Sequence, residues 1–395
     1  MRPYHRQDYY LAVTTFVLVV FGLIMVASAS VVESYAATGS NNYYFIRQSV
    51  FAVIGIFLWW FLQKLDYRYW KRWATTLLIV AGVLLVAVLI PGLGVEAGGA
   101  RRWIGFGDFT LQASEVAKFA LVVYLAYWFE KKGREITDFY KTFLPFVLVL
   151  VGVFFLVMQE PDLGTALVIA LIAGTMYMVA GASWGQLSGL VLAGVAGVLL
   201  LIKVAPYRLK RLLTFLNPSA DPLGAGYHIN QALLAIGSGG IFGLGYGHSR
   251  QKYNFLPEPS SDSIFAIIGE ELGLIGSVFL VIIPFAIIVW RGLLVARKAP
   301  DMFGRMMALG LTCWIGYQAI INIGAIVGLF PLTGVPLPFV SLGGSSLVIM
   351  LAASGVLLNI SKQTVKSTED ENPLSWWWNW WARYSHTGSS RSIRK

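Results

Sequence analysis

Charged residues are scarce in this sequence. Only 13% of its 395 residues are charged, about half the share usual in soluble domains, whereas 57% are hydrophobic and the mean hydropathy is +0.67. This balance excludes a soluble globular domain, a disordered chain and a coiled coil. The 14 Trp, 18 Tyr and 24 Phe are of the amphipathic kind that gathers at the two faces of a bilayer. The composition therefore predicts a polytopic membrane protein.

Cysteine and histidine are nearly absent. With Cys313 alone, no disulfide can form within the chain and a cysteine-based metal site is disfavoured, so we expect a small buried hydrophobic residue there. The four histidines lie far apart and show no metal-ligand spacing. The formal charge of +10 does not indicate nucleic acid as a partner, because in a membrane protein the distribution of charge matters more than its sum. The sequence therefore requires no metal and predicts no nucleic-acid partner.

Ten segments are candidates for crossing a bilayer, since a helix needs about 20 apolar residues to span ~30 Å of hydrocarbon. They are 11–30, 46–63, 75–91, 112–129, 143–158, 163–181, 186–204, 263–290, 303–328 and 338–360. No internal repeat of the kind common in transporters is evident. The expected fold class is an all-α polytopic membrane protein of about ten transmembrane helices, with a large extracytoplasmic loop between the seventh and the eighth.

Lys and Arg indicate the orientation of these spans. With the N-terminus inside, 20 basic residues lie on that side, nine lie on the other, and Lys118 is within the membrane. Basic loops favour the cytoplasm, so both termini are expected there. Residues 1–362 then form a transmembrane domain, followed by a polar, Trp-rich cytoplasmic tail at 363–395. We expect a disordered tail whose Trp cluster dips into the inner interface, with docking of a partner as the alternative.

Two long polar segments, 92–111 and 205–262, face outward in this orientation. The second is longer than an ordinary connection, and loops of that length are usually functional or disordered. Its apolar spacing predicts short amphipathic helices at the membrane surface.

Charges inside membrane spans are costly and suggest function. Glu115 and Lys118 are i,i+3 neighbours on one helical face. They form either a structural ion pair or a site at which Lys118, positioned by Glu115, meets an anionic substrate. Asp162 stands at the start of a helix, where an N-cap carboxylate is favoured, whether or not it also meets substrate.

Adjacent arginines, Arg101 and Arg102, lie on the translocated side against the usual charge bias. Arginine suits bidentate phosphate binding, and anchoring to lipid headgroups is the alternative.

Asp262 stands at the outer mouth of the eighth span, where an N-cap role is the simplest explanation. Glu270 and Glu271 lie deeper, where two adjacent carboxylates cannot both face one partner, so at least one is expected to turn inward.

Glycine and proline mark two further segments. The glycine-rich stretch 237–247 predicts a flexible loop, or less simply a phosphate cradle, and it has no Gly-Lys-Ser/Thr ending of an ATP-binding P-loop. Prolines and glycines between 331 and 346 predict a broken or re-entrant segment lining a cavity, because freed backbone groups need partners at membrane depth.

Taken together, these motifs resemble the SEDS family of shape, elongation, division and sporulation proteins, which includes RodA, FtsW and SpoVE. The resemblance covers about residues 10 to 362. Its matching pieces are 99–104, 112–118, 160–165, 256–273 and 322–346. The phrase NFLPEP at 254–259 and the GARRW loop at 99–103 look more like the FtsW/SpoVE division-type branch than RodA.

The resemblance implies polymerisation of lipid II into peptidoglycan glycan strands, together with a class B penicillin-binding protein and the divisome or elongasome. It places the family's essential aspartate at Asp262. The family's acid and lysine of the fourth span map onto Glu115 and Lys118, and its hairpin aspartate maps onto Asp162. It also implies the bacterial cytoplasmic membrane as the location.

The sequence departs from the family pattern around the essential aspartate. The family usually has His-Thr before this residue and Phe after it, whereas Ser260, Ser261 and Ser263 stand here. The aspartate is kept, and its immediate packing is what the departure changes.

A single carboxylate suits this chemistry because a sugar pyrophosphate already carries a good leaving group. Asp262 would deprotonate the 4-hydroxyl of the acceptor GlcNAc, which attacks the donor's anomeric carbon and inverts it to a β-1,4 bond. The candidate pyrophosphate contacts are Arg101, Arg102 and Lys118, together with Lys252. No cofactor is demanded, and a divalent cation bridging the pyrophosphate has no evident ligand cluster.

Two other functions compete with this one. A lipid-linked precursor flippase or other transporter would also use ten spans, broken helices and intramembrane charges, although its path should be lined through the full depth. A non-catalytic scaffold would leave the buried charges unexplained.

Overall fold

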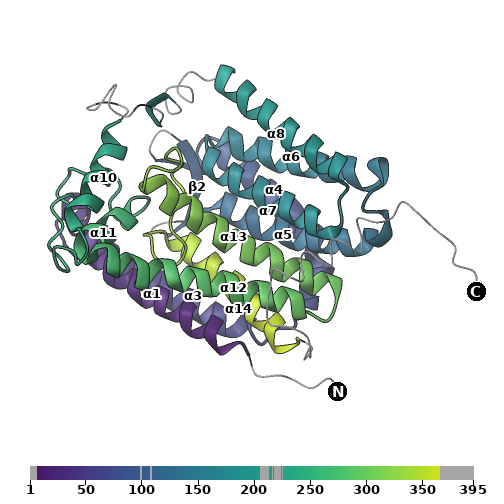
Figure 1. Cartoon of the computed structure of the whole chain (residues 1–395), viewed down its shortest axis with the longest axis horizontal. Coiled ribbons are helices and arrows are strands. Elements are labelled where there is room, and N and C mark those ends of the chain that lie inside the picture. The colour runs from purple at the N-terminus through teal and green to yellow at the C-terminus, as the bar shows by residue number, and fades with distance from the viewer. Residues whose placement is uncertain are drawn as a thin grey trace, which may run out of the picture.

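The computed structural model describes residues 7–97, 100–106, 109–204, 213–215, 217, 224 and 226–364. Within these ranges the chain is a bundle of long helices that run side by side, with one small sheet at an end of the bundle (Figure 1). The structure is 74% helical, which confirms the all-α fold class. The tail predicted at 363–395 lies outside the described residues from 365 onward.

The long helices follow the chain in order. They are α1 (Tyr9–Ala29), α2 (Val31–Thr38), α3 (Tyr43–Leu62), α4 (Arg68–Leu89), α5 (Ala113–Lys132), α6 (Leu144–Gln159), α7 (Leu163–Ala180), α8 (Trp184–Val204), α10 (Tyr227–Gly239), α11 (Ile264–Ser277), α12 (Ile283–Lys298), α13 (Met302–Ile326) and α14 (Gly344–Lys362). Short π-helical turns at Phe139–Phe143 and Val278–Ile282 lead into α6 and join α11 to α12.

Each of the ten segments predicted to span the membrane coincides with one of these helices or with a continuous pair of them. Eight helical segments of the described chain are long and apolar enough to cross a membrane, with Ile264–Lys298 counted as one. The helices α5 and α8 are not among the eight, so ten crossings remain a prediction. The last span begins at Gly344 rather than at 338, because the preceding proline-rich segment is not helical.

The segment 92–111 forms a structure that its sequence did not predict. The strands β1 (Gly94–Ala97), β2 (Ala100–Phe106) and β3 (Phe109–Gln112) make an antiparallel sheet in the order β1-β2-β3. Such short strands give no pattern long enough to separate them from a loop. The sheet leads directly into α5 and therefore fixes where that helix begins.

Long-range contacts bring the first and last helices together. The Asp8 backbone N–H, at the N-cap of α1, donates to Ser361 Oγ of α14 at 3.1 Å, and Arg291 of α12 pairs with the Asp8 carboxylate at 2.7 Å. In Figure 1 the start of α1 and the end of α14 lie at one end of the bundle, whereas α10, α11 and β2 lie toward the other. We call the latter the site end and the former the terminal end.

The large loop before α11 is built around a helix. Its part 227–239 is α10, a 13-residue helix that packs against α11, which agrees with the amphipathic helices expected here. The remaining positions of that expectation, 205–212, 216, 218–223 and 225, lie outside the described residues.

Candidate functional site

Asp262 lies at the site end, immediately before α11, and its backbone is held from two sides. Its carbonyl accepts a hydrogen bond from Asn322 Nδ2 of α13 at 2.8 Å. Ser341 Oγ donates to the carbonyl of Ser261 at 2.6 Å. The N-cap of α11 is Ser263, and the Asp262 carboxylate accepts only from Ser261 Oγ, at 3.4 Å, within the described chain. The expected N-cap role is therefore wrong, because the helix starts one residue later, and the carboxylate is available for chemistry.

The surroundings of Asp262 favour its protonated form. Burial, together with the negative charges of Glu258 and Asp162, raises the pKa of its carboxyl to about 6 against the opposing effects of Ser261 and Arg102. A backbone turn with positive φ at Gly334 faces this carboxylate, and a Cβ there would approach Oδ2 to 3.3 Å. A carboxylate that titrates near neutral pH is suited to accept a proton.

Neighbouring arginines of β2 point in different directions, since successive strand residues face opposite sides of a sheet. Arg101 pairs with Glu96 of β1 at 3.2 Å. Arg102 instead reaches the turn between α6 and α7, where its Nε donates to the Glu160 carbonyl at 3.1 Å and its Nη2 to the Pro161 carbonyl at 2.7 Å. The structure therefore separates the two predicted phosphate contacts, and Arg102 is the one whose charge acts on Asp262.

Asp162 caps α7, as the sequence predicted. Its Oδ1 accepts from the Thr165 N–H at 2.9 Å and its Oδ2 from Thr165 Oγ1 at 2.8 Å. The residue is buried, so its negative charge acts through protein on Asp262 rather than through water.

Glu160 is a residue of this site that sequence reasoning did not single out. Its side chain is fully buried, and neither carboxyl oxygen has a hydrogen-bond partner in the described chain. Burial, together with the negative charge of Asp162, raises its pKa to about 9 against the opposing effect of Arg102. The Glu160 carboxyl is therefore neutral at pH 7. Only its place in the hairpin, two residues before Asp162, could have drawn attention to it.

Glu115 and Lys118 form the predicted ion pair, with Nζ and Oε1 2.7 Å apart and both side chains almost completely buried. The Lys118 ammonium also donates to Gln318 Oε1 of α13 at 2.9 Å, and Gln318 Nε2 donates to the Pro336 carbonyl at 3.1 Å. The pair thus supports, from below, the proline-rich segment that faces Asp262. In this arrangement Lys118 does not reach the surface.

The segment between α13 and α14 confirms the expected broken helix. It is not helical from Pro331 to Gly343, and its Val335 carbonyl accepts from Asn322 Nδ2 at 2.8 Å. Its freed backbone groups are thus satisfied by side chains of neighbouring elements, as required at membrane depth. That it lines a cavity remains a prediction.

Lys252 is likewise buried. Its Nζ pairs with Glu271 Oε1 at 2.9 Å and donates to Ser28 Oγ of α1 at 3.0 Å and to the Gly247 carbonyl at 2.8 Å. Glu270 accepts from the Arg250 N–H at 2.9 Å. Both carboxylates turn inward toward the loop 247–252, which confirms that at least one does. The expectation that they cannot both face one partner is wrong, because Ser249 donates its hydroxyl to Glu270 and its N–H to Glu271 Oε1 at 3.4 Å.

Helix α11 is broken just after these two residues, at Gly273, where φ is 69° and ψ is −168°. The carbonyls of Glu270 and Glu271 accept from Leu244 N and Gly245 N, each at 2.9 Å, instead of from the next helical turn. The glycine-rich segment 237–247 supplies these donors. It was expected to be a flexible loop, but it is packed into the helix break, where a Cβ on Gly243 would lie 2.2 Å from the Glu271 carbonyl oxygen.

The three serines at the departure from the family pattern are all hydrogen-bonded. Ser260 Oγ donates to Glu33 of α2, and Ser263 Oγ lies 2.7 Å from His228 Nε2 of α10. The single hydroxyl proton of Ser261 is shared between Glu258 Oε2 at 3.0 Å and Asp262 Oδ1 at 3.4 Å. Hydroxyl contacts thus replace bulkier side chains around the aspartate. Within the described residues, no group of three or more His, Cys, Asp or Glu could hold a metal ion.

This arrangement defines a class, namely polytopic helical membrane proteins with a carboxylate of raised pKa beside an arginine at one end of the bundle. The chain belongs to the FtsW/RodA/SpoVE family, whose model, described as "Cell cycle protein", matches residues 9–366. Stage V sporulation protein E of Bacillus subtilis (strain 168) is 44% identical over 355 residues, which cover 90% of this chain and 97% of that protein.

Other relatives extend the comparison. A probable peptidoglycan glycosyltransferase FtsW of Trichlorobacter lovleyi is 42% identical, covering 91% of this chain and 95% of that protein. A solved structure described as "Structural coordination of polymerization and crosslinking by a peptidoglycan synthase complex" matches with a TM-score of 0.74 and 28% identity, over 90% of this chain and 97% of that one. The rod shape determining protein RodA of Thermus thermophilus matches with a TM-score of 0.67 and 28% identity, over 91% and 98%.

Proposed function

We propose that this chain is a peptidoglycan glycosyltransferase that polymerises lipid II into β-1,4 glycan strands by inverting transfer at the outer face of the bacterial cytoplasmic membrane. The observation that carries the proposal is the Asp262 carboxylate, which caps no helix, has a pKa of about 6 and lies within the electrostatic reach of Arg102. The names of relatives that share most of the chain's length support the same activity.

The proposed reaction is a single displacement. Asp262 takes the proton of the acceptor's 4-hydroxyl as its oxygen forms a bond to the anomeric carbon of the donor strand. The bond from that carbon to the undecaprenyl pyrophosphate breaks, and the leaving group departs with the electron pair. A positioned general base contributes about 10²–10⁴-fold. Because attack comes from the face opposite the leaving group, an α-linked donor gives a β bond.

The cations take different roles in this proposal. Arg102, beside the carboxylates, is the preferred contact for the departing pyrophosphate, whose negative charge it stabilises. Arg101, paired with Glu96 on the other face of the sheet, is a further candidate. The buried Lys118 and Lys252 hold the segments on either side of Asp262 in place, and a direct contact with phosphate would require them to leave their partners.

The acids besides Asp262 act indirectly in the same scheme. Glu115 keeps the Lys118 ammonium in the interior, and Asp162 raises the proton affinity of Asp262. The reaction as written uses no cofactor. A divalent cation at the pyrophosphate would find its ligands mainly on the substrate.

We further propose a class B penicillin-binding protein as the partner that cross-links the strands, and the divisome as the setting, with the elongasome as the alternative. The support is the likeness to FtsW and sporulation relatives and to a structure described as a peptidoglycan synthase complex. Both termini are placed in the cytoplasm. The Asp8–Ser361 hydrogen bond supports a shared side for the two ends of the described chain, and the bias of Lys and Arg in the sequence favours the cytoplasm as that side.

The test is polymerisation of labelled lipid II by the purified chain with its penicillin-binding protein, the latter made unable to form glycan strands. We expect strands with the natural chain and none with Asp262→Asn at equal folding and partner binding. Normal polymerisation by Asp262→Asn would show that the assigned base is wrong. Lipid movement across vesicles without any strand formation would instead favour the flippase.

A further inference from the structure

The side chain that follows the proposed base joins two elements of the fold. Ser263 Oγ lies 2.9 Å from the Pro257 carbonyl and 2.7 Å from His228 Nε2. A carbonyl can only accept, so the single hydroxyl proton of Ser263 goes to Pro257. The serine oxygen is then the acceptor toward His228, and hydrogen-bond logic assigns a proton to His228 Nε2.

The hydrogen bond between His228 and Ser263 is one of three that restrain the backbone around Asp262. Asn322 holds the carbonyl of Asp262, and Ser341 holds the carbonyl of Ser261. Ser263 is fully buried, so its hydroxyl has no water to replace a lost partner. His228 is therefore the restraint on the helix side of Asp262.

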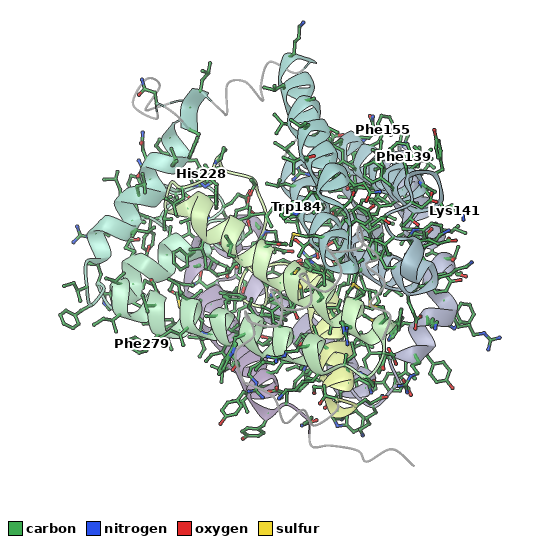
Figure 2. All side chains as sticks on the ribbon, turned by 45° about the vertical axis from the view of Figure 1, so that its right-hand side comes forward. Phe139, Lys141, Phe155, Trp184, His228 and Phe279 are labelled. Carbon is green, nitrogen blue, oxygen red and sulfur yellow. The ribbon has the colours of Figure 1, made fainter. Side chains whose placement is uncertain are left out.

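Helix α10 is docked firmly enough to act in this way. At its far end, Gly239 lies so close to α11 that a Cβ there would stand 2.0 Å from the Gly269 carbonyl oxygen. At its near end, His228 lies on the side of α10 that faces the bundle (Figure 2). The helix thus contacts α11 at both of its ends, with the histidine beside the start of α11.

We propose that His228 is a positioning residue for Asp262, and that its Nε2–H, donated to Ser263, fixes the direction in which the carboxylate faces the acceptor hydroxyl. This rests on the proposed function. Imidazole and imidazolium can both carry the Nε2 proton, so the restraint survives protonation of the ring. A side chain without a donor leaves Ser263 and the backbone of Asp262 free to turn.

Three substitutions separate this role from simple packing. His228→Phe keeps a ring but removes the donor, His228→Gln keeps an N–H donor on a flexible chain, and Ser263→Ala removes the same bond from the other side. His248→Ala is the matched control, since His248 is exposed and its ring Nδ1 lies 3.0 Å from the Tyr246 carbonyl of its own loop. Lipid II polymerisation is measured per folded molecule, with kcat and KM determined separately.

We expect His228→Phe to lower kcat about tenfold while KM changes by no more than about twofold, because the bond acts on the base rather than on substrate binding. His228→Gln should recover most of the lost rate, and His248→Ala should match the natural chain. Ser263→Ala also removes the hydrogen bond to the Pro257 carbonyl, so it should cost at least as much as His228→Phe. Combining the two substitutions should cost little more than Ser263→Ala alone, since the bond to His228 is already absent there.

Several results would overturn the proposal. The positioning role is wrong if His228→Phe has the kcat of the natural chain, or if His228→Gln is as slow as His228→Phe. It is also wrong if the losses in the double variant are additive. In each of these cases the proposed glycosyltransferase function still stands. If the natural chain with its partner formed no glycan strands, the proposed glycosyltransferase function and the positioning role of His228 would both be wrong. If the variants do not fold, the ¹⁵N signals of histidine-labelled natural protein decide, because a neutral His228 without a proton on Nε2 contradicts the assigned bond.

Discussion

The raised pKa of Asp262 comes from its burial and from the neighbouring negative charges of Glu258 and Asp162, and this gives a test at the scale of one residue. A base works only when deprotonated, and its deprotonated fraction rises with pH through the pKa, here about 6. We therefore expect kcat/KM to fall as the pH drops below about 6. Glu258→Gln removes a charge that raises this pKa, so it should move the acid limb to lower pH. The measurement is the pH profile of lipid II polymerisation.

The control for that profile is Glu135→Gln, since Glu135 is exposed and pairs with Lys141. It should leave the acid limb in place. If the acid limb of the Glu258→Gln variant lies at the same pH as that of the natural chain, the charge of Glu258 does not act on the Asp262 carboxylate.

Glu160 permits a prediction about stability. Its pKa of about 9 in the folded protein exceeds its ordinary value of 4.5, so the folded chain keeps a proton that the unfolded chain releases. Stability is then lost as the pH rises from 4.5 toward 9, by about 1.4 kcal/mol for each pH unit. Glu160→Gln removes this loss, and we expect its melting temperature to exceed that of the natural chain at pH 8 by more than at pH 5.

Thermal unfolding in detergent at the two pH values measures this effect. A melting-temperature difference between Glu160→Gln and the natural chain that does not grow with pH would contradict a neutral, buried carboxyl at this position.

Some residues of the site were recognisable from sequence and others were not. Asp162 was predicted as an N-cap because capping is local and depends on residues three positions apart. Asp262 was found by resemblance, but its N-cap interpretation failed because Ser263 is the N-cap and the helix starts at Ile264. The contacts of Arg102 with the 160–161 turn could not be predicted, because they join segments that only the folded bundle brings together.

At the scale of elements, the break in α11 is the feature with the clearest consequence. Gly273→Ala places a Cβ in a region of positive φ, 2.3 Å from the Gly243 nitrogen. We expect it to destabilise the protein by roughly 2–3 kcal/mol, since strain and overpacking both act there. Gly237→Ala in α10 is the control, because a Cβ at that position meets no atom within 4 Å. Denaturation midpoints of the two variants should differ accordingly, and equal midpoints would argue against the break.

The ion pair of Glu115 and Lys118 within α5 gives a second prediction at this scale. Lys118→Met leaves the Glu115 carboxylate buried without its cation, which we expect to cost about 3–5 kcal/mol. The double variant Glu115→Met/Lys118→Met removes both charges and should recover most of that stability. Thermal melts of both variants measure this. Retained stability in Lys118→Met together with lost polymerisation would instead indicate a direct contact of Lys118 with substrate.

The elements themselves were predicted with unequal success. Helices of about 20 apolar residues stand out because backbone groups in lipid must be satisfied within the segment. The sheet at 94–112 and the packed glycine-rich segment did not stand out. The strands of the sheet are only four to seven residues long, too short for a clear periodic signal, and the glycine-rich segment is held by backbone hydrogen bonds to α11 that leave no pattern in the sequence.

At the scale of the whole molecule, the orientation in the membrane can be tested with single cysteines in a chain whose Cys313 has been replaced by Ala. Lys141, labelled in Figure 2, is exposed and predicted to lie inside, whereas Phe242 is exposed in the large loop that is predicted to lie outside. We expect a membrane-impermeant maleimide to modify Phe242→Cys in intact cells and Lys141→Cys only after permeabilisation. The opposite pattern would reverse the topology.

The contacts of α14 with α1 and α3 have a consequence for the order in which the protein is synthesised and folded. Helix α14 is synthesised last, yet it packs against α3 and meets α1 through Thr15 and Ser354, whose hydroxyls lie 3.3 Å apart. During translation the early helices therefore enter the bilayer with polar and small-residue surfaces that lipid alone must cover. Nascent chains that stop short of α14 would present those surfaces to membrane-embedded proteases and chaperones, so completion of the final helix is the event that seals the bundle.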